Sequence, residues 1–207
     1  NGNNLFDAGY MQQVKDYMDG KTDDYIWGEG SGGKWNYDYT TANVDWLKEY
    51  YRSMSPSHEH NISASGGTDK ISYYLSGNYM GQEGFMRYGT DDYSRYTLTG
   101  KFSGQLTKML KVDYMSRYVR TDYSRPTVMD DTLYNNLLRR SRPTRPYYDP
   151  NGYLMADINY VAAFEDGGRY KEQKDALVQQ FKVTLTPLKN WNIIGEMNIK
   201  IDNNWIH

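Results

Sequence analysis

The sequence predicts an all-β protein, an antiparallel section of about six strands from the wall of a transmembrane β-barrel. From residue 60 onward, apolar and polar residues alternate with a period of two in six separate runs. Most runs are 10 to 12 residues long, near the roughly 9–11 residues that a tilted strand needs to cross a bilayer. Short and long connections between the runs alternate strictly, which is typical of membrane barrels with brief turns on one side and extended loops on the other.

The composition permits this fold and excludes other classes. The 207 residues include 38% hydrophobic residues at a mean hydropathy of −0.88. No run of about 18 apolar residues exists, so no transmembrane helix is predicted. A net charge of −2 and a pI of about 5.9 argue against bulk nucleic-acid binding. The 22 Tyr beside only five Phe suit strands and membrane–water interfaces, because Tyr joins an apolar ring to a polar tip.

Residues 1–56 are predicted to be an external loop region with short helices. One helix is expected where four large residues recur at helical spacing before Gly20, namely Leu5, Tyr10, Val14 and Tyr17. Residues 23–40, rich in Gly and aromatic residues, are expected to be a loop. A second helix is predicted over 43–54, with Asn43 as its N-cap. Its expected apolar stripe is formed by Val44, Leu47 and Tyr51.

Residues 57–207 are predicted to be the barrel section. Its strands are expected at about 60–65, 70–80, 93–103, 109–120, 177–187 and 191–202. A long external loop over 121–176 joins the fourth strand to the fifth, and the segment 131–140 within it predicts a short helix that clusters Leu133, Leu137 and Leu138. In the tight turn between the first two strands, Gly66 and Gly67 are expected to supply positive φ angles.

Each run has a polar side and an apolar side, because side chains alternate across a strand. Apart from His60, the charges within the runs fall on one side, which carries Arg95, Lys101, Lys111, Asp113, Arg117, Lys182, Glu196 and Lys200. In a barrel this side faces a water-filled lumen, so the lumen-facing candidates are Tyr74, Arg95, Lys101 and Arg117. The apolar side carries mid-strand Gly77, Gly100 and Gly195, which a tightly packed core usually avoids.

An alternative reading is a soluble, aromatic-rich β-sandwich that binds glycans, because sandwich strands alternate as well. The two readings differ on the apolar side of the strands. In a barrel section that side is exposed in the isolated chain, whereas in a sandwich it is buried against a second sheet. The residues that discriminate between them are Leu75, Leu98, Phe102, Val112, Ile193 and Ile199.

One stretch, "HEHNISASGGTDKISYYLSGNYMGQEGF" at 58–85, combines many positions at fixed spacing. The positions are Asn61, Ser63, Ser65, Gly66, Gly67, Tyr73, Ser76, Tyr79, Gln82 and Gly84. This pattern resembles the segment that follows the plug in SusC-like TonB-dependent transporters. The helix before it is similar through Asp45, Trp46 and Tyr51. A later loop is similar through its Tyr-Asp-Pro-x-Gly turn, at Tyr148, Asp149, Pro150 and Gly152.

The resemblance implies an internal section of a roughly 22-stranded transmembrane β-barrel, located after the plug, and therefore a longer intact protein. It further implies an energy-coupled importer of oligosaccharides or oligopeptides in the outer membrane of a Gram-negative bacterium. The implied partners are outer-membrane lipid, a SusD-like surface lipoprotein, and the TonB complex acting through N-terminal parts outside this chain. Neither a cofactor nor nucleic acid is expected.

Ligand contacts are expected from aromatic side chains in the long loops, since such rings stack on sugar faces and peptide side chains. The candidates are Trp27, Trp35, Tyr37, Tyr147, Tyr148 and Tyr153. The same rings could instead pack the loops together or anchor them at the membrane interface, and both readings stay open.

Metal and catalytic sites are not predicted. His58 and His60 stand two residues apart, but no third ligand accompanies them. The paired carboxylates at 22–24, 90–92 and 129–131 are interpreted as solvated loop charge, and "GEGSGG" at 28–33 is interpreted as a loop because no strand precedes it and no helix follows. No catalytic arrangement of side chains stands out, so an enzyme is not expected.

Overall fold

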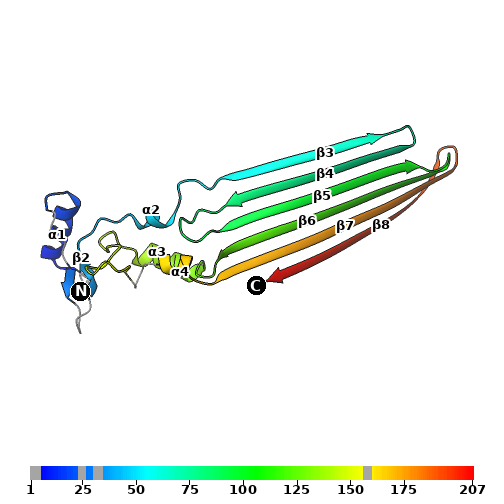
Figure 1. Cartoon of the computed structure of the whole chain (residues 1–207). Coiled ribbons are helices and arrows are strands. Elements are labelled where there is room, and N and C mark those ends of the chain that lie inside the picture. The colour runs from blue at the N-terminus through cyan, green and yellow to red at the C-terminus, as the bar shows by residue number, and fades with distance from the viewer. Residues whose placement is uncertain (1–5, 23–26, 30–34, 156–159) are drawn as a thin grey trace. The chain divides into compact units, whose positions relative to one another are not determined.

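The alternating side chains of residues 57–206 form one six-stranded antiparallel sheet (Figure 1). The computed structural model describes residues 6–22, 27–29, 35–155 and 160–207. The strands are β3 (Ser57–Gly67), β4 (Ile71–Glu83), β5 (Asp92–Gln105), β6 (Leu110–Pro126), β7 (Arg169–Leu188) and β8 (Trp191–Ile206). Each strand lies beside its neighbours in sequence, so β3 and β8 are the two edges of the sheet. None of the helices in the described part of the chain combines the length and the hydrophobicity needed to cross a membrane.

The strands are longer than the sequence pattern predicts. β6 continues to Pro126 rather than ending near residue 120, and β7 begins at Arg169 rather than near residue 177. The connection between them therefore covers 127–168 instead of 121–176. The extensions carry polar residues on both sides, so the alternation that marks a half-buried strand is missing from them.

The turn between β3 and β4 corrects one expectation. Gly66 and Gly67 belong to β3, and neither is among the described glycines with positive φ, which are Gly20, Gly89 and Gly152. The reason for glycine here is close approach of the chain, because a Cβ on Gly67 would collide with the carbonyl oxygen of Ile71. The turn itself is closed by the amide of Thr68, which donates to that same oxygen at 2.6 Å.

The chain divides into two compact units. We call the first the sheet unit; it comprises Met54–Phe85, Thr90–Arg125 and Arg169–His207. We call the second the loop unit; it comprises Asn1–Ser53, Met86–Gly89 and Pro126–Gly168. The loop unit contains α1 (Ala8–Met18), β1 (Trp27–Glu29), β2 (Trp35–Thr40), α2 (Trp46–Tyr50), α3 (Asp131–Arg140) and α4 (Val161–Glu165). β1 and β2 pair as a small antiparallel sheet, so the expectation of a loop over 23–40 was wrong for these residues, whose backbone groups pair across the two strands.

The loop unit has its own hydrophobic core. Its buried residues are Trp46, Tyr50, Met86, Leu133, Leu137, Met155, Val161 and Phe164. Side chains distant in sequence meet here, since the Tyr50 ring lies 6.0 Å from that of Phe164. The Tyr50 hydroxyl accepts a hydrogen bond from the amide of Tyr160 at 2.8 Å. Burial raises the pKa of Tyr50 to about 12.

The predicted helices agree with the structure in part. α1 is capped by Asp7, whose carboxylate accepts from the amide of Tyr10 at 2.7 Å; Leu5 lies outside the described residues. α3 covers the predicted segment. α2 is shorter than the predicted 43–54 and is capped by Asp45 rather than Asn43. α2 has only five residues. Trp46 and Tyr50, four residues apart, share its buried face, whereas Leu47 of the predicted stripe is exposed.

Leu137 and Leu138 of α3 provide a matched test of this core. Leu137 is 5% exposed and Leu138 is 59% exposed. Leu137→Ala should cost about 2–5 kcal/mol through lost burial and the cavity left behind, whereas Leu138→Ala should stay within about 0.5 kcal/mol of the parent. Limited proteolysis of the intact protein should then cleave within 127–168 faster in the Leu137 variant alone. Equal cleavage of both variants would contradict this core.

Candidate functional site

Strand register assigns every residue of the sheet to one of two faces. Partnered residues share a face, and the pairs Ile62↔Gly77, Gly77↔Leu98 and Leu98↔Tyr118 link four strands. The rings of Tyr114 and Phe181, 5.2 Å apart, carry the same face from β6 to β7. We call this the apolar face; it holds the even-numbered residues of β3, β5 and β6 and the odd-numbered residues of β4, β7 and β8. The opposite side is the polar face.

The apolar face is uncovered. Leu75 is 57% exposed and Leu98 is 58% exposed. Phe102, Ile193 and Ile199 are exposed as well, and Val112 is half-buried. Within the described residues no second sheet covers these side chains. This exposure contradicts the β-sandwich alternative, in which the same residues would be enclosed by protein.

Aromatic rings form two rows on the apolar face. One row, nearer the short turns, pairs Tyr73 with Phe102 and Phe102 with Tyr114. The other joins Tyr79 to Tyr96, with ring centroids 5.0 Å apart. Between the rows, β3, β4 and β5 carry aliphatic side chains or Gly, whereas β6 carries Ser116 and Tyr118. The rows are six residues apart along β4, about 20 Å at the usual rise per residue.

The four residues predicted to face a lumen all lie on the polar face, by strand register. Tyr74 pairs with Lys101, whose ammonium lies 5.7 Å from the centre of the Tyr74 ring. Arg117 pairs with Thr99, and Arg95 pairs with Met80. That this face lines a lumen remains a prediction, which we take up below.

A hollow of about 520 Å³ lies near the short-turn end of the sheet. Its polar-face lining includes Tyr74, Lys101, Ser103, Asp113, Gln180 and Lys182. Asp113 accepts a hydrogen bond from the Ser103 hydroxyl at 2.6 Å and forms an ion pair with Lys111 at 3.1 Å. Among the described residues, neither Lys101 nor Lys182 has a carboxylate within ion-pair distance. Lys182 lies opposite Glu196 in the register of β7 and β8, so the hollow offers a solute charges of both signs, from two lysines and from Asp113.

The candidate ligand-binding aromatics fall into different environments. Tyr147 packs into the loop core, where its ring stacks on that of Trp46 at 5.9 Å and its hydroxyl donates to that of Tyr88 at 3.2 Å. Burial first, and then this hydrogen bond, raises the pKa of Tyr147 above its ordinary value. This geometry favours the packing role for Tyr147. Trp35 is half-buried, and the side chains of Trp27 and Tyr37 lie outside the described residues.

Tyr148 and Tyr153 are exposed at the tight turn that the sequence predicted. One carboxylate oxygen of Asp149 accepts from the amides of Asn151 and Tyr153, both at 2.9 Å. Gly152 adopts a φ of 84°, which suits a residue without a Cβ. The turn therefore presents two aromatic rings to solvent, and among the candidates whose side chains the structure describes these two are the exposed ones.

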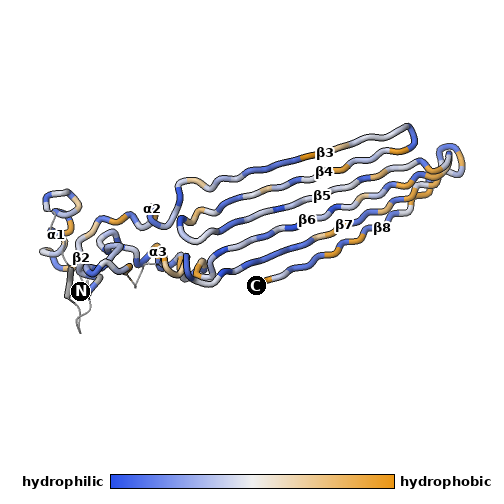
Figure 2. The backbone as a smooth tube through the Cα atoms, viewed as in Figure 1, coloured by the Kyte–Doolittle hydropathy of each residue, from blue (hydrophilic) through white to orange (hydrophobic). Residues whose placement is uncertain are grey.

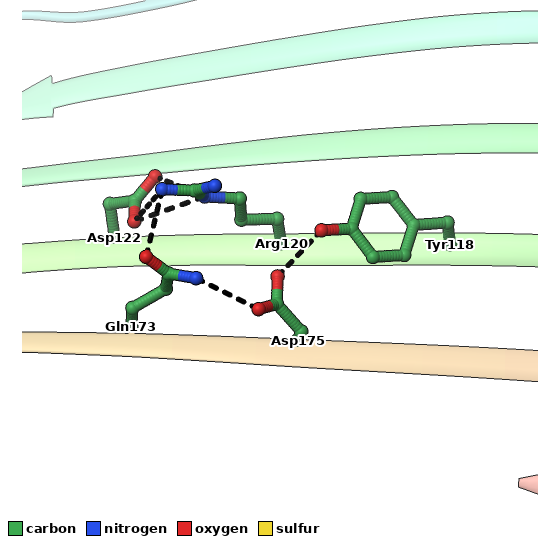
Figure 3. Close-up of polar contacts among 5 residues, drawn as sticks. All are labelled: Tyr118, Arg120, Asp122, Gln173 and Asp175. Atoms are coloured by element: carbon green, nitrogen blue, oxygen red, sulfur yellow. Dashed lines mark hydrogen bonds and ion pairs between the residues drawn. The ribbon is translucent and has the colours of Figure 1, made fainter. Parts of the chain in front are cut away.

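A polar network between β6 and β7 was not predicted (Figure 3). The Tyr118 hydroxyl donates to Asp175 at 2.6 Å, and the Gln173 amide donates to the other oxygen of Asp175 at 2.8 Å. Arg120 donates to Gln173 at 2.9 Å and binds the Asp122 carboxylate with two nitrogens at 3.0–3.2 Å. All five residues lie on the apolar face. The sequence pattern missed them because it placed most of them in a loop.

The remaining candidate groups have structural roles. The His58 and His60 rings, 5.5 Å apart, each lie against Tyr79. Asp130, one of the paired carboxylates, caps α3 by accepting from the amide of Leu133 at 2.8 Å. Across the described part of the chain, no three His, Cys, Asp or Glu side chains gather as a metal site would require.

One exposed apolar face and one charged face are typical of a section of transmembrane β-barrel wall. The chain is similar to known proteins named as TonB-dependent receptors. No protein-family model matches the chain. Over 77 residues it is 36% identical to TonB-dependent receptor P3 of Formosa agariphila, a match that covers 37% of the chain and 7% of that protein. Over 113 residues it is 27% identical to TonB-dependent receptor P26 of the same organism, with 55% and 11% covered.

Solved structures show the same fold. The RagAB peptide importer in its closed-closed state superposes with a TM-score of 0.62 at 20% identity, over 97% of this chain and 23% of that one. A second structure, of the RagAB peptide transporter, gives a TM-score of 0.59 at 19% identity, over 95% and 22%. The resemblance to a section of a SusC-like TonB-dependent transporter, inferred from the sequence, is thereby confirmed. The chain spans about a tenth or less of the curated relatives and under a quarter of the solved chains.

Tyr147 and Tyr153 allow packing to be separated from ligand contact. Tyr147→Ala removes the ring stacked on Trp46, so it should destabilise the loop unit by roughly 2 kcal/mol or more. Tyr153 is 72% exposed, and Tyr153→Ala should leave stability almost unchanged. Amide hydrogen exchange in the intact protein should accelerate within the loop unit for the first variant only. Unchanged protection in the Tyr147 variant would show that its ring is not needed for packing.

Proposed function

We propose that this chain is part of a TonB-dependent outer-membrane importer, in which the sheet unit is barrel wall and the loop unit is external. The observation that carries the proposal is the sheet itself, with an exposed apolar face backed by a face that bears charged side chains of both signs. In water such an apolar face would cause association. In a bilayer it is satisfied by lipid, and the polar face by a hydrated pore.

The height of the apolar face supports this placement. On β4 it runs from Ile71 to Tyr79, nine residues. Nine residues span about 30 Å along a strand, and a tilt of about 40° reduces this to roughly 23 Å. The apolar band of outer-membrane barrels is about 25 Å tall and is flanked by aromatic girdles. The same tilt places the two aromatic rows about 15 Å apart in height, inside the band, so it is the whole apolar face that matches the height of the band.

The polar face then lines the lumen, with Tyr74, Arg95, Lys101 and Arg117 in contact with water or solute. In such barrels the short turns are periplasmic and the long connections are external. By this rule the connection 127–168, with Tyr148 and Tyr153 at its exposed turn, meets ligand or partner outside the cell. The resemblance adds a SusD-like surface lipoprotein as a partner at that side, and the TonB complex as the source of energy through parts outside this chain.

The solute is an oligosaccharide or an oligopeptide, and the sheet supports either. Aromatic rings at the external turn suit both sugar faces and peptide side chains. The names of the similar solved structures favour peptides. No catalytic role is proposed, since the similar proteins are named as receptors and importers.

Uptake by cells tests the proposed function. A strain lacking the intact transporter should lose accumulation of one class of labelled solute when offered matched panels of oligosaccharides and oligopeptides. Restoring the gene should restore uptake, and removing TonB should abolish it again, since import of this kind depends on that energy source. Unchanged uptake of every solute in both panels would overturn the proposal.

Leu75 and Ser76, adjacent on β4, test the orientation of the wall. Leu75 lies at the middle of the apolar face and Ser76 lies on the polar face. Leu75→Arg should destabilise the barrel by about 2–4 kcal/mol, the cost of Arg near the bilayer midplane, whereas a lumen position accepts the charge. The amount of folded, heat-modifiable protein in outer membranes should fall for Leu75→Arg and not for Ser76→Arg. A reversed order would mean that the faces are assigned the wrong way round.

A further inference from the structure

The apolar face stops before the strands do. Its last large apolar residues are Tyr79 on β4, Tyr96 on β5, Tyr118 on β6 and Leu177 on β7, whereas on β8 Ile201 is followed by Asn203 and then by Trp205. β6 nevertheless continues to Pro126, and β7 begins as early as Arg169. In Figure 2 the left-hand parts of β6 and β7 are largely blue, whereas orange segments gather toward their short-turn ends. Both strands therefore extend about 26 Å past the apolar residues.

The same face is polar in these extensions. Its residues there, which we call the polar collar, are Arg120, Asp122, Ser124, Lys171, Gln173 and Asp175. The neighbouring strand continues the collar, because Ser94 pairs with Asp122 and Asp92 pairs with Ser124. Trp205, which pairs with Gln173, is the large apolar side chain at this level. An indole suits the membrane–water interface, where one end is apolar and the other is hydrated.

The charged and hydrogen-bonded side chains in Figure 3 argue against placing this part of the strands in the hydrocarbon layer. Charged side chains on the lipid face of a barrel destabilise it most at the midplane and little near the interface. Arg120 and Asp175 lie two residues past the last apolar positions of β6 and β7, and Asp122 lies two residues beyond Arg120. The Tyr118 hydroxyl, bonded to Asp175, is the point at which the face changes from apolar to polar.

A shallow hollow of about 350 Å³ lies on the collar. Its lining includes Asp92, Ser94, Arg120, Asp122, Lys171 and Gln173. The lining combines cations, carboxylates and hydroxyls, so the hollow offers both hydrogen-bond donors and acceptors without a strong net charge. Such a lining suits the hydroxyls and phosphates of a sugar-bearing lipid headgroup better than an acyl chain or an apolar protein surface.

We propose that the Tyr118–Asp175 hydrogen bond marks the outer edge of the hydrocarbon layer, and that the polar collar contacts the headgroups of the outer leaflet. The proposal rests on the proposed function, which places the apolar face in a bilayer, and adds where that bilayer ends. Beyond this edge β6 and β7 continue outside the hydrocarbon and are joined by side-chain hydrogen bonds.

Nitroxide labels can locate this edge, because the chain contains no cysteine of its own. Single labels at Ser116→Cys and Ser124→Cys sample the apolar face of β6 below and above Tyr118. Leu98→Cys and Ser94→Cys repeat the comparison on β5, which keeps the test valid if one variant fails to fold. Thr121→Cys, on the polar face at collar level, is the control. Each label is placed in the intact transporter, otherwise free of cysteine, in vesicles made from outer-membrane lipid.

Collision with oxygen reports hydrocarbon, and collision with a water-soluble nickel chelate reports the aqueous and headgroup layers. Labels at Ser116 and Leu98 should favour oxygen, and labels at Ser124 and Ser94 should favour the nickel chelate by several-fold. Oxygen dominance at Ser124 and Ser94 would overturn the collar and leave the proposed function standing. Nickel dominance at Ser116 and Leu98 would instead overturn the barrel wall itself. Labels at Ser124 that neither reagent reaches would mean that a protein covers the collar, which also refutes headgroup contact.

Discussion

The structure depends on one constraint, the strict alternation of side chains across a hydrogen-bonded antiparallel sheet. Once Ile62 pairs with Gly77 and Gly77 with Leu98, every other residue on these strands is assigned to a face. A slip of one residue between two strands would exchange lipid-compatible and water-compatible side chains along the whole strand. Register therefore decides, for each strand, which side chains lie on the apolar face and which lie on the polar face.

The side chains of the apolar face also change in character along the length of the strands. On the apolar face, the residues of β3, β4 and β5 between the two aromatic rows are aliphatic or Gly, and hydrogen-bonded charges follow at one end of β6 and β7. The hydrogen bond from Tyr118 to Asp175 lies at this change. In the apolar part of this face, exposed Leu and Ile side chains line the strands; past Tyr118, side-chain bonds such as Arg120 to Gln173 join the strands instead.

The loop unit follows different rules, since it buries side chains in a conventional core. Tyr50 and Phe164 meet there although they are far apart in sequence. Aromatic residues consequently divide between two tasks. Tyr147 is held against Trp46 inside the core, whereas Tyr148 and Tyr153 are presented to solvent by a turn that the Asp149 carboxylate stabilises. The core gives those exposed rings a rigid support, which favours recognition at low entropic cost.

The sequence by itself determined the six strands, their faces, the segment of α3 and the resemblance to a transporter family, because period-two alternation and fixed motif spacing are local signals. It did not determine where β6 and β7 end, since Arg120 to Ser124 and Lys171 to Asp175 are polar on both sides and leave no period to detect. Nor did it separate Tyr147 from Tyr148, because which of two adjacent rings is buried depends on Trp46 and Tyr88, distant in sequence. Only the tertiary structure decides such contacts, because burial and hydrogen bonding are properties of neighbours in space.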